Sequence, residues 1–257
     1  MIKKSNESFF SRLGKFSLLI LRNPKQVRTY ARSGLKDKYS LRDVKATGIL
    51  FLHIPKCAGV SVNNALYSSL GAGHTDLDRI LVGLGPLEFT NVFKFSIVRN
   101  PWDRLVSAYF FLKNGGFGQR DKEFFDSHLS HYKSFDHFVR DWLSEENVMR
   151  WNHFIPQHKF LSIVGGVVDL NYLCFFESLE EDFSNIYDAK QWERFKGLSM
   201  DNKSSHKDYR IYYTDETIKA VESVYKEDVE LFGYDFHGKN YERQVSWRNK
   251  EFPLVLS

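Results

Sequence analysis

Short continuous apolar runs recur along the chain, and each is followed at once by a helical pattern. The runs at residues 49–54, 93–98 and 172–176 are largely apolar, with His53 as the one polar residue of the first. The runs at 49–54 and 172–176 predict buried strands, whereas in the strand expected over 93–98 Phe93, Phe95 and Ile97 share one face. After each run, apolar residues recur every three or four positions, which predicts a helix. Strands that alternate with helices predict a central parallel β-sheet flanked by helices, and therefore an α/β fold.

The same pattern divides the chain into three segments. Residues 1–45 predict a basic helical arm, residues 46–240 hold the alternating strands and helices, and residues 241–257 form a tail. Within the arm, apolar residues recur at helical spacing among Lys and Arg, from Phe9 to Ile20. Such a helix either packs on its own domain or makes peripheral contact with an anionic membrane, and the sequence leaves both alternatives open.

Charge is spread unevenly over these segments. The net charge is +4, but residues 1–45 carry twelve Lys and Arg against three Asp and Glu, about +9. The remaining 24 basic and 29 acidic residues give about −5, so bulk charge excludes a nucleic-acid-binding body. A chain of 257 residues that is 42% hydrophobic can bury one substantial core.

Cysteine usage and segment length bear on the compartment. The two cysteines, Cys57 and Cys174, are too few for a disulfide framework. This usage fits a reducing compartment, so we expect a cytoplasmic protein. The longest early apolar stretch, residues 16–21, is about a third of the length that spans a bilayer, and we expect no transmembrane segment.

The first stretch with recognisable chemistry is the turn after residues 49–54. Pro55 ends the strand, and Lys56, Gly59 and Ser61 lead into a helix. A loop of small residues before a helix points backbone N–H groups at one spot, and Lys56 adds a positive charge, so the stretch predicts an anion site, most often for phosphate. It is not a Walker A loop, because Lys56 precedes Gly59. Taken alone, it also fits an ordinary strand–helix turn.

A second strand–turn–helix stretch follows residues 93–98. Asn100 is a good N-cap and Pro101 suits the first helical position, so a helix is expected to begin there at once. Arg99 stands at the carboxyl end of the strand, and Ser107 lies on the helix two turns further on. Ligands bind at the carboxyl ends of strands in open α/β sheets, so we expect both stretches to deliver cationic groups to one rim.

Together the two stretches resemble the sulfotransferase superfamily, most closely its carbohydrate-type branch. The stretch from His53 to Ser61 is similar to the family's 5′-phosphosulfate loop, and the stretch from Arg99 to Tyr109 is similar to its 3′-phosphate segment. Weaker similarities extend over most of residues 48–236. The resemblance implies a P-loop-like three-layer fold, 3′-phosphoadenosine 5′-phosphosulfate (PAPS) as sulfuryl donor without a metal, and a hydroxyl acceptor, expected to be a carbohydrate.

The resemblance also implies a role for each matching residue. It makes His74 the general base, with His153 as the second candidate, and Lys56 the group that stabilises the leaving phosphate. The residues implied to hold the donor are Lys56, Cys57, Ala58, Gly59, Val60, Ser61, Arg99 and Ser107, with Lys203 and Ser205 on a covering loop. His153 and Gln157 are the implied acceptor contacts. Cys57 departs from the family, which usually has Thr there, and a thiol is a poorer hydrogen-bond donor to phosphate.

Two other function classes compete with this interpretation. A P-loop kinase or NTPase would require a Walker A Lys-Ser/Thr and a strand ending in Asp, whereas residues 93–98 are followed by Arg99. A non-catalytic protein would use the basic arm to bind a membrane or polyanion, and Cys57 is the feature that favours it. The His and Cys spacings fit no standard metal site.

Overall fold

The fold is described from a computed structural model. It describes residues 8–22, 24, 41–67, 73–164, 166–190 and 207–254. The chain divides into two compact units. The first unit comprises Met1–Val98, Gln157–Asn202 and Val245–Ser257, and the second comprises Arg99–Pro156 and Lys203–Gln244.

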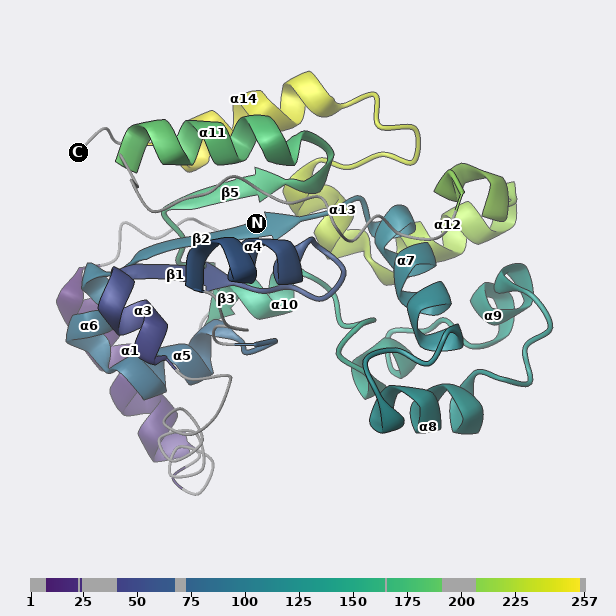
Figure 1. Ribbon diagram of the computed structural model, residues 1–257, viewed down its shortest axis with the longest axis horizontal. Helices are drawn as coiled ribbons and strands as arrows, with labels where there is room; N and C mark the ends of the chain where they lie inside the picture. Colours follow the sequence, from purple (N-terminus) through teal and green to yellow (C-terminus); the bar gives the residue numbers. More distant parts are fainter. Residues whose placement is uncertain are drawn as a thin grey trace. The chain divides into compact units, whose positions relative to one another are not determined.

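A parallel sheet forms the centre of the first unit. Its described strands are β1 (Ile49–Leu52), β2 (Phe93–Val98) and β5 (Tyr172–Phe175), in the order β1-β2-β5, as Figure 1 shows. All residues of β1 and β5 are buried, as the continuous apolar runs predicted. The predicted α/β class, with a central parallel sheet flanked by helices, is confirmed.

Helices and one small hairpin complete the first unit. They are α1 (Phe9–Arg22), α3 (Arg42–Thr47), α4 (Gly59–Tyr67), α5 (Leu77–Leu84), α6 (Pro86–Asn91), α10 (His158–Leu161), β3 (Ser162–Ile163), β4 (Val167–Val168), η2 (Phe176–Ser178) and α11 (Leu179–Lys190). The antiparallel pair β3–β4 is separate from the parallel sheet. Helix α14 (Tyr241–Glu251) begins in the second unit and continues into the first.

Side chains hold β1 in place on both sides. On one side, the Tyr67 hydroxyl at the end of α4 accepts from Phe51 N at 2.9 Å and donates to Ile49 O at 2.7 Å. On the other, Ser96 Oγ of β2 donates to Leu52 O at 2.8 Å. Burial raises the pKa of Tyr67, so the phenol keeps its proton and can donate at any physiological pH. The strand that carries the loop, and the helix after it, are therefore tied together at their far ends.

Helix α1 packs on its own unit through a buried ion pair. Arg12 donates to both carboxylate oxygens of Asp169, from Nε at 2.6 Å and from Nη2 at 2.9 Å. Lys94 lies beside this pair and donates to Phe89 O at 2.9 Å, and its burial lowers its pKa to about 8. This contact is one of the two alternatives left open for the arm.

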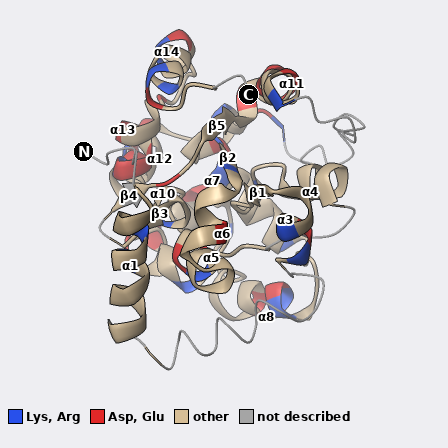
Figure 2. Cartoon of the chain, turned by 90° about the vertical axis from the view of Figure 1, so that its left-hand side faces the viewer, with Lys and Arg blue, Asp and Glu red and all other residues tan. Residues whose placement is uncertain are grey.

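The other side of α1 is apolar and exposed. Phe10 and Leu21 are each 78% exposed, and no acidic residue lies on the helix, as Figure 2 shows. None of the helices in the described part of the chain is long and apolar enough to cross a bilayer.

The segment expected as a tail contains helix α14, which is tied to the first unit by a buried ion pair. Arg248 of α14 donates to Asp182 of α11, and its guanidinium lies 5.0 Å from the centre of the Tyr172 ring. Asp182 also accepts from Phe175 N at 2.7 Å and from Ser178 Oγ at 3.1 Å. Burial raises the pKa of Asp182, although these partners and Arg248 oppose the rise. The desolvation of this carboxylate is therefore costly, and Arg248 offsets part of the cost.

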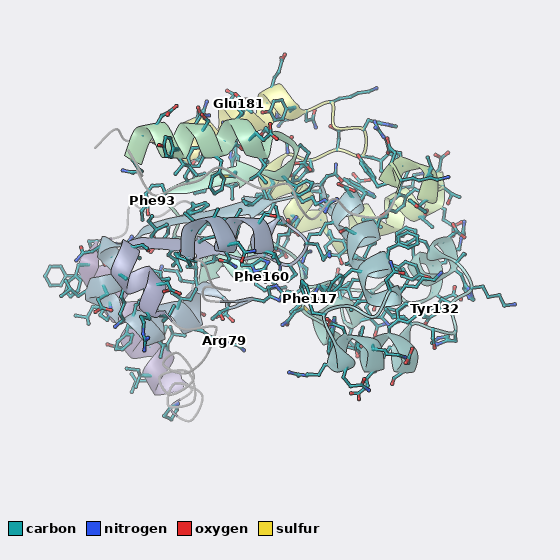
Figure 3. All side chains as sticks on the ribbon, viewed as in Figure 1. Arg79, Phe93, Phe117, Tyr132, Phe160 and Glu181 are labelled. Carbon is teal, nitrogen blue, oxygen red and sulfur yellow. The ribbon has the colours of Figure 1, made fainter. Side chains whose placement is uncertain are left out.

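The second unit is helical and rich in aromatic residues. Its elements are α7 (Pro101–Lys113), α8 (Gln119–His128), α9 (Phe135–Asp141), η1 (Asn147–Arg150), η3 (Tyr209–Tyr212), α12 (Asp215–Val224) and α13 (Lys226–Phe232). The ring centres of Phe138 and Trp142 are 5.2 Å apart, and those of Trp142 and Phe154 are 4.9 Å apart. Figure 3 shows the side chains of this unit, with Phe117 and Tyr132 labelled.

We predict that Arg248→Ala lowers the free energy of unfolding by about 3–5 kcal/mol, because it leaves the Asp182 carboxylate buried without its cation. Urea unfolding followed by circular dichroism measures the change. Lys250→Ala, an exposed position on the same helix, is the control and should stay within about 0.5 kcal/mol of the wild type. Equal stabilities of the two variants would contradict the role given to the pair.

Candidate active site

The loop between β1 and α4 has an unusual backbone. Lys56 has a φ of 70° and Ala58 a φ of 57°, both in the left-handed region that residues with a Cβ rarely adopt. Each such residue costs on the order of 1–3 kcal/mol and persists only where its surroundings enforce it. Cys57 N donates back to Ile54 O at 3.3 Å and closes the turn between them. Left-handed residues on both sides of Cys57 are typical of the concave backbone turns whose amides bind anions.

Helix α4 begins at the end of this loop and adds further donors. It has nine residues, starting at Gly59, and its first ladder bond runs from Val62 N to Ala58 O at 3.2 Å. The preceding N–H groups of the first turn have no carbonyl of their own helix to bond. With the partial positive charge of the helix end, they favour an anion. The residues expected to hold a phosphate, from Lys56 to Ser61, thus form one continuous stretch.

Gly59 is required by the packing of the loop. A Cβ at this position would lie 1.7 Å from Cδ2 and 1.8 Å from Nε2 of His53, far inside any real contact distance. The imidazole of His53, which follows β1, therefore lies directly against the start of α4. Glycine is needed here because the His53 side chain approaches its backbone closely. The sequence predicted only that a small residue would lie in an anion-binding loop.

The side chain of Cys57 faces the interior. Its thiol is fully buried and donates to Gln157 Oε1 at 3.5 Å, with Pro55 O at 3.7 Å. Gln157 is itself fully buried. The structure thus places Gln157, expected as an acceptor contact, against the loop between β1 and α4, where it supports the loop from inside the unit.

Two histidines and Lys56 come together beside the loop. The rings of His53 and His74 are 4.4 Å apart between centres and nearly perpendicular, at 76°. Asn63 of α4 lies on the other side of His53, with Asn63 Nδ2 3.3 Å from His53 Nδ1. Burial holds the pKa of His53 well below 6.5, and the positive charges of His74 and Lys56 lower it further. His53 is therefore neutral at pH 7, while His74 is half-buried and reachable from solvent.

In the second unit, Arg99 is held by the helix that follows it. Arg99 is buried, and its Nε donates to Asp103 Oδ2 at 2.8 Å. Asn100 caps α7 as predicted, accepting from Trp102 N at 3.1 Å, with Pro101 at the start of the helix. These contacts fix the guanidinium relative to the first turn of α7.

Two further candidates lie in the second unit. Ser107 is buried on α7. His153 is buried beside the Phe111 ring at 4.9 Å between centres, and its Nδ1 is 3.8 Å from Asp121 Oδ1. The same Asp121 oxygen accepts from Trp151 Nε1 at 3.1 Å. His153 thus packs beside an aromatic ring and near a carboxylate, and acceptor contact by this residue stays a prediction.

Two predicted donor contacts cannot be placed. Lys203 and Ser205 lie outside the described residues. Within the residues that are described, no group of three or more His, Cys, Asp or Glu side chains is arranged to hold a metal ion.

Asn63 is a site residue that the sequence interpretation missed. It is fully buried on α4, next to His53. An amide on the apolar side of a predicted helix is a usable signal, because a buried polar group needs a hydrogen-bonding partner. Its partner could not be found from the sequence, because nothing local links residues ten positions apart across a strand, a turn and a helix.

Comparison with known families gives one match. A family model described as the Sulfotransferase family matches residues 41–235, well over half of the chain. The matched range includes β1, the loop, α4, β2 and α7. Neither curated proteins nor solved structures gave a significant match.

We predict that Gly59→Ala destabilises the protein by about 1–3 kcal/mol or more, because the added methyl overlaps the His53 ring. Chemical denaturation measures the change. Gly14→Ala is the control, since its Cβ would meet nothing within 4 Å, and it should be neutral or stabilising. If the overlap is the cause, adding His53→Ala to Gly59→Ala should recover part of the lost stability; strict additivity of the two changes would refute the explanation.

We also predict a pH dependence of stability from His53. Because its folded pKa lies below the 6.5 of the unfolded chain, its neutral state contributes fully above pH 6.5. Below pH 6.5 the unfolded chain takes up a proton that the folded protein does not, and stability falls by up to about 1.4 kcal/mol per pH unit. Urea titrations at several pH values should give a shallower fall for His53→Gln than for wild type, whereas the exposed His131→Gln should keep the wild-type slope.

Proposed function

The chain belongs to the sulfotransferase family, in its carbohydrate-type branch, and we propose that it transfers the sulfuryl group of PAPS to a hydroxyl group of a carbohydrate. The observation that carries the proposal is the convergence of Lys56, His74 and the start of α4 around one loop. It offers an anion cradle, a cation and an imidazole in the same unit.

In this proposal the loop binds the 5′ end of the donor. The amides of Ala58 to Ser61 and the Ser61 hydroxyl hold the 5′-phosphate, while Cys57 shapes the loop through its N–H bond to Ile54 O. During transfer, the bond between sulfur and the bridging phosphate oxygen breaks while a bond forms from the acceptor oxygen to sulfur. Negative charge grows on the bridging oxygen, and the Lys56 ammonium stabilises it. The products are the sulfate ester and 3′-phosphoadenosine 5′-phosphate (PAP).

We assign the 3′-phosphate to Arg99 and Ser107. A guanidinium carries five donors in a planar fork, so Arg99 can bind phosphate oxygens while Nε keeps its bond to Asp103. The Ser107 hydroxyl adds a donor from α7. Asp103 fixes the orientation of the fork, which favours a planar, two-point contact over a diffuse charge interaction.

The acceptor proton is assigned to His74. Its imidazole is half-buried in the same unit as the loop, which supports general-base chemistry near neutral pH. His153 remains the second candidate, but its packing beside Phe111 and Asp121 favours a structural or acceptor-positioning role.

The remaining assignments concern the donor cover, the acceptor and the arm. Lys203 and Ser205 are proposed to cover the nucleotide and His153 to position the acceptor, while the fully buried Gln157 supports the loop behind them. Membrane contact through α1 stays a prediction, supported by the exposed Phe10 and Leu21 and by the basic arm. The family match removes the support for a kinase or NTPase.

The proposed donor site predicts that Arg99→Ala weakens PAP binding about 10- to 100-fold, because a charge-assisted contact to phosphate is lost. Isothermal titration calorimetry measures the affinity. Arg150→Ala, an exposed position of the same unit, is the matched control and should bind PAP like wild type. Unchanged affinity in Arg99→Ala would refute the assignment.

Transfer of radiolabelled sulfate from PAPS to a panel of carbohydrates tests the reaction itself. We expect sulfated product with wild type and little with Lys56→Ala. PAP binding without transfer to any hydroxyl acceptor would favour the non-catalytic alternative.

A further inference from the structure

We propose that His53 is a positioning residue: it holds the His74 imidazole beside the phosphate loop and leaves the proton of the reaction to His74. The inference rests on the proposed function, in which His74 is the base. It adds a residue that does not touch the donor or the acceptor but determines which of two neighbouring imidazoles does the chemistry.

The His53 ring is fixed on three sides. Asn63 Nδ2 lies 3.3 Å from its Nδ1, and the backbone of Gly59 lies directly against Cδ2 and Nε2. The Phe51 ring of β1 stacks on it, at 18° between planes and 5.9 Å between centres. A ring held by a strand residue, a helix residue and the loop glycine has little freedom to rotate. His53 therefore gives His74 a rigid surface.

His74 is placed by that surface and by the helix that follows it. The His53 and His74 rings meet at 4.4 Å in an edge-to-face arrangement, a favourable geometry for two aromatic groups. Two residues later, Asp76 caps α5 by accepting from Arg79 N at 3.0 Å, so the chain is anchored just beyond His74. The His53 ring thus contacts the His74 imidazole, and the cap of α5 anchors the chain just after His74. The imidazole itself is half-buried, so an acceptor can reach it.

Two neighbouring imidazoles could compete for one proton, but the surroundings of His53 and His74 differ. The charged or titratable groups that act on His53 are His74 and Lys56, and α4 contributes the neutral amide of Asn63. The contact between Asn63 Nδ2 and His53 Nδ1, 3.3 Å long, ties the His53 ring to α4. Burial and the two positive neighbours both disfavour a charged His53. The more exposed His74 is therefore the imidazole of the pair that takes the proton.

Neutrality of His53 also preserves the strength of the base. A second positive charge 4.4 Å away would repel a proton on His74 and lower its basicity. The fold excludes this charge by desolvation, without removing the ring that positions His74. The His53 side chain thus contacts His74 without competing with it for the proton.

The direct test is nitrogen NMR of the imidazoles in the whole protein between pH 5 and pH 8. We expect His53 to remain neutral over this range while His74 titrates in a single transition. Protonation of His53 near pH 6 to 7, or a two-step titration of His74 that becomes single-step in His53→Gln, would overturn the proposal. This readout needs neither substrate nor turnover.

Kinetics with PAPS and the best acceptor of the panel supply the second test. His53→Gln should lower kcat about tenfold, with little change in KM for PAPS and with the acidic limb of the kcat/KM pH profile retained. His74→Gln should lower kcat about a hundredfold or more while PAP affinity stays unchanged. His131→Gln, exposed and in the second unit, is the control and should behave like wild type. Full kcat in His53→Gln would overturn the proposal.

A different outcome would separate the proposal from the function it rests on. If His74→Gln keeps wild-type turnover, the base assignment fails, and the positioning role fails with it even where sulfate transfer itself is retained. If no variant transfers sulfate but all bind PAP, the proposed reaction fails. Should His53→Gln be unstable, Asn63→Ser frees the ring while keeping the imidazole, and it should lower kcat in the same direction; an unchanged kcat in that stable variant counts against the proposal.

Discussion

The contact between Gly59 and the His53 ring is the constraint on which the rest of the candidate site depends. A strand and the helix after it normally need a loop roomy enough for their side chains, but here the imidazole that follows β1 occupies the place of a Cβ at the start of α4. The chain must therefore turn between Pro55 and Ala58 within very little space. Lys56 and Ala58 adopt left-handed conformations within this short turn, which favours amides that face a common anion.

Such a strained turn persists only if its ends and its middle are held. The far ends of β1 and α4 are joined by the Tyr67 hydroxyl, which bonds both an amide and a carbonyl of the strand. The carboxyl end of β1 is held by Ser96, and the middle of the loop by the buried thiol of Cys57 on Gln157. Each bond contributes about 1 kcal/mol, comparable with the cost of one left-handed residue. A thiol at position 57 is therefore compatible with the observed loop conformation, because its hydrogen bond is directed into the core.

What the sequence could predict is what local chemistry determines. The buried strands follow from continuous apolar runs, and the start of α7 follows from the side chain of Asn100 and the fixed φ of Pro101, both confirmed in the structure. The contacts that complete the site and the first unit lie between distant positions: Cys57 with Gln157, His53 with His74, and, away from the site, Asp182 with Arg248. No residue pattern encodes such pairs, since each partner has an ordinary local explanation. Gln157 illustrates this, because a polar residue in a ligand-rich stretch suggests an acceptor contact equally well whether it faces solvent or the loop.

The charges around the loop explain why a base can function there at all. Burial lowers the pKa of His53, and the positive charges of His74 and Lys56 lower it further, so a second positive charge is disfavoured at this place in the fold. In the proposed function, PAPS brings phosphate and sulfonate groups to Lys56 and offsets its field. A base beside Lys56 would then meet a smaller opposing charge with the donor in place than after the product nucleotide has left. Because the buried His53 stays neutral throughout, this response is confined to a single imidazole, and deprotonation of the acceptor is coupled to occupancy of the donor site.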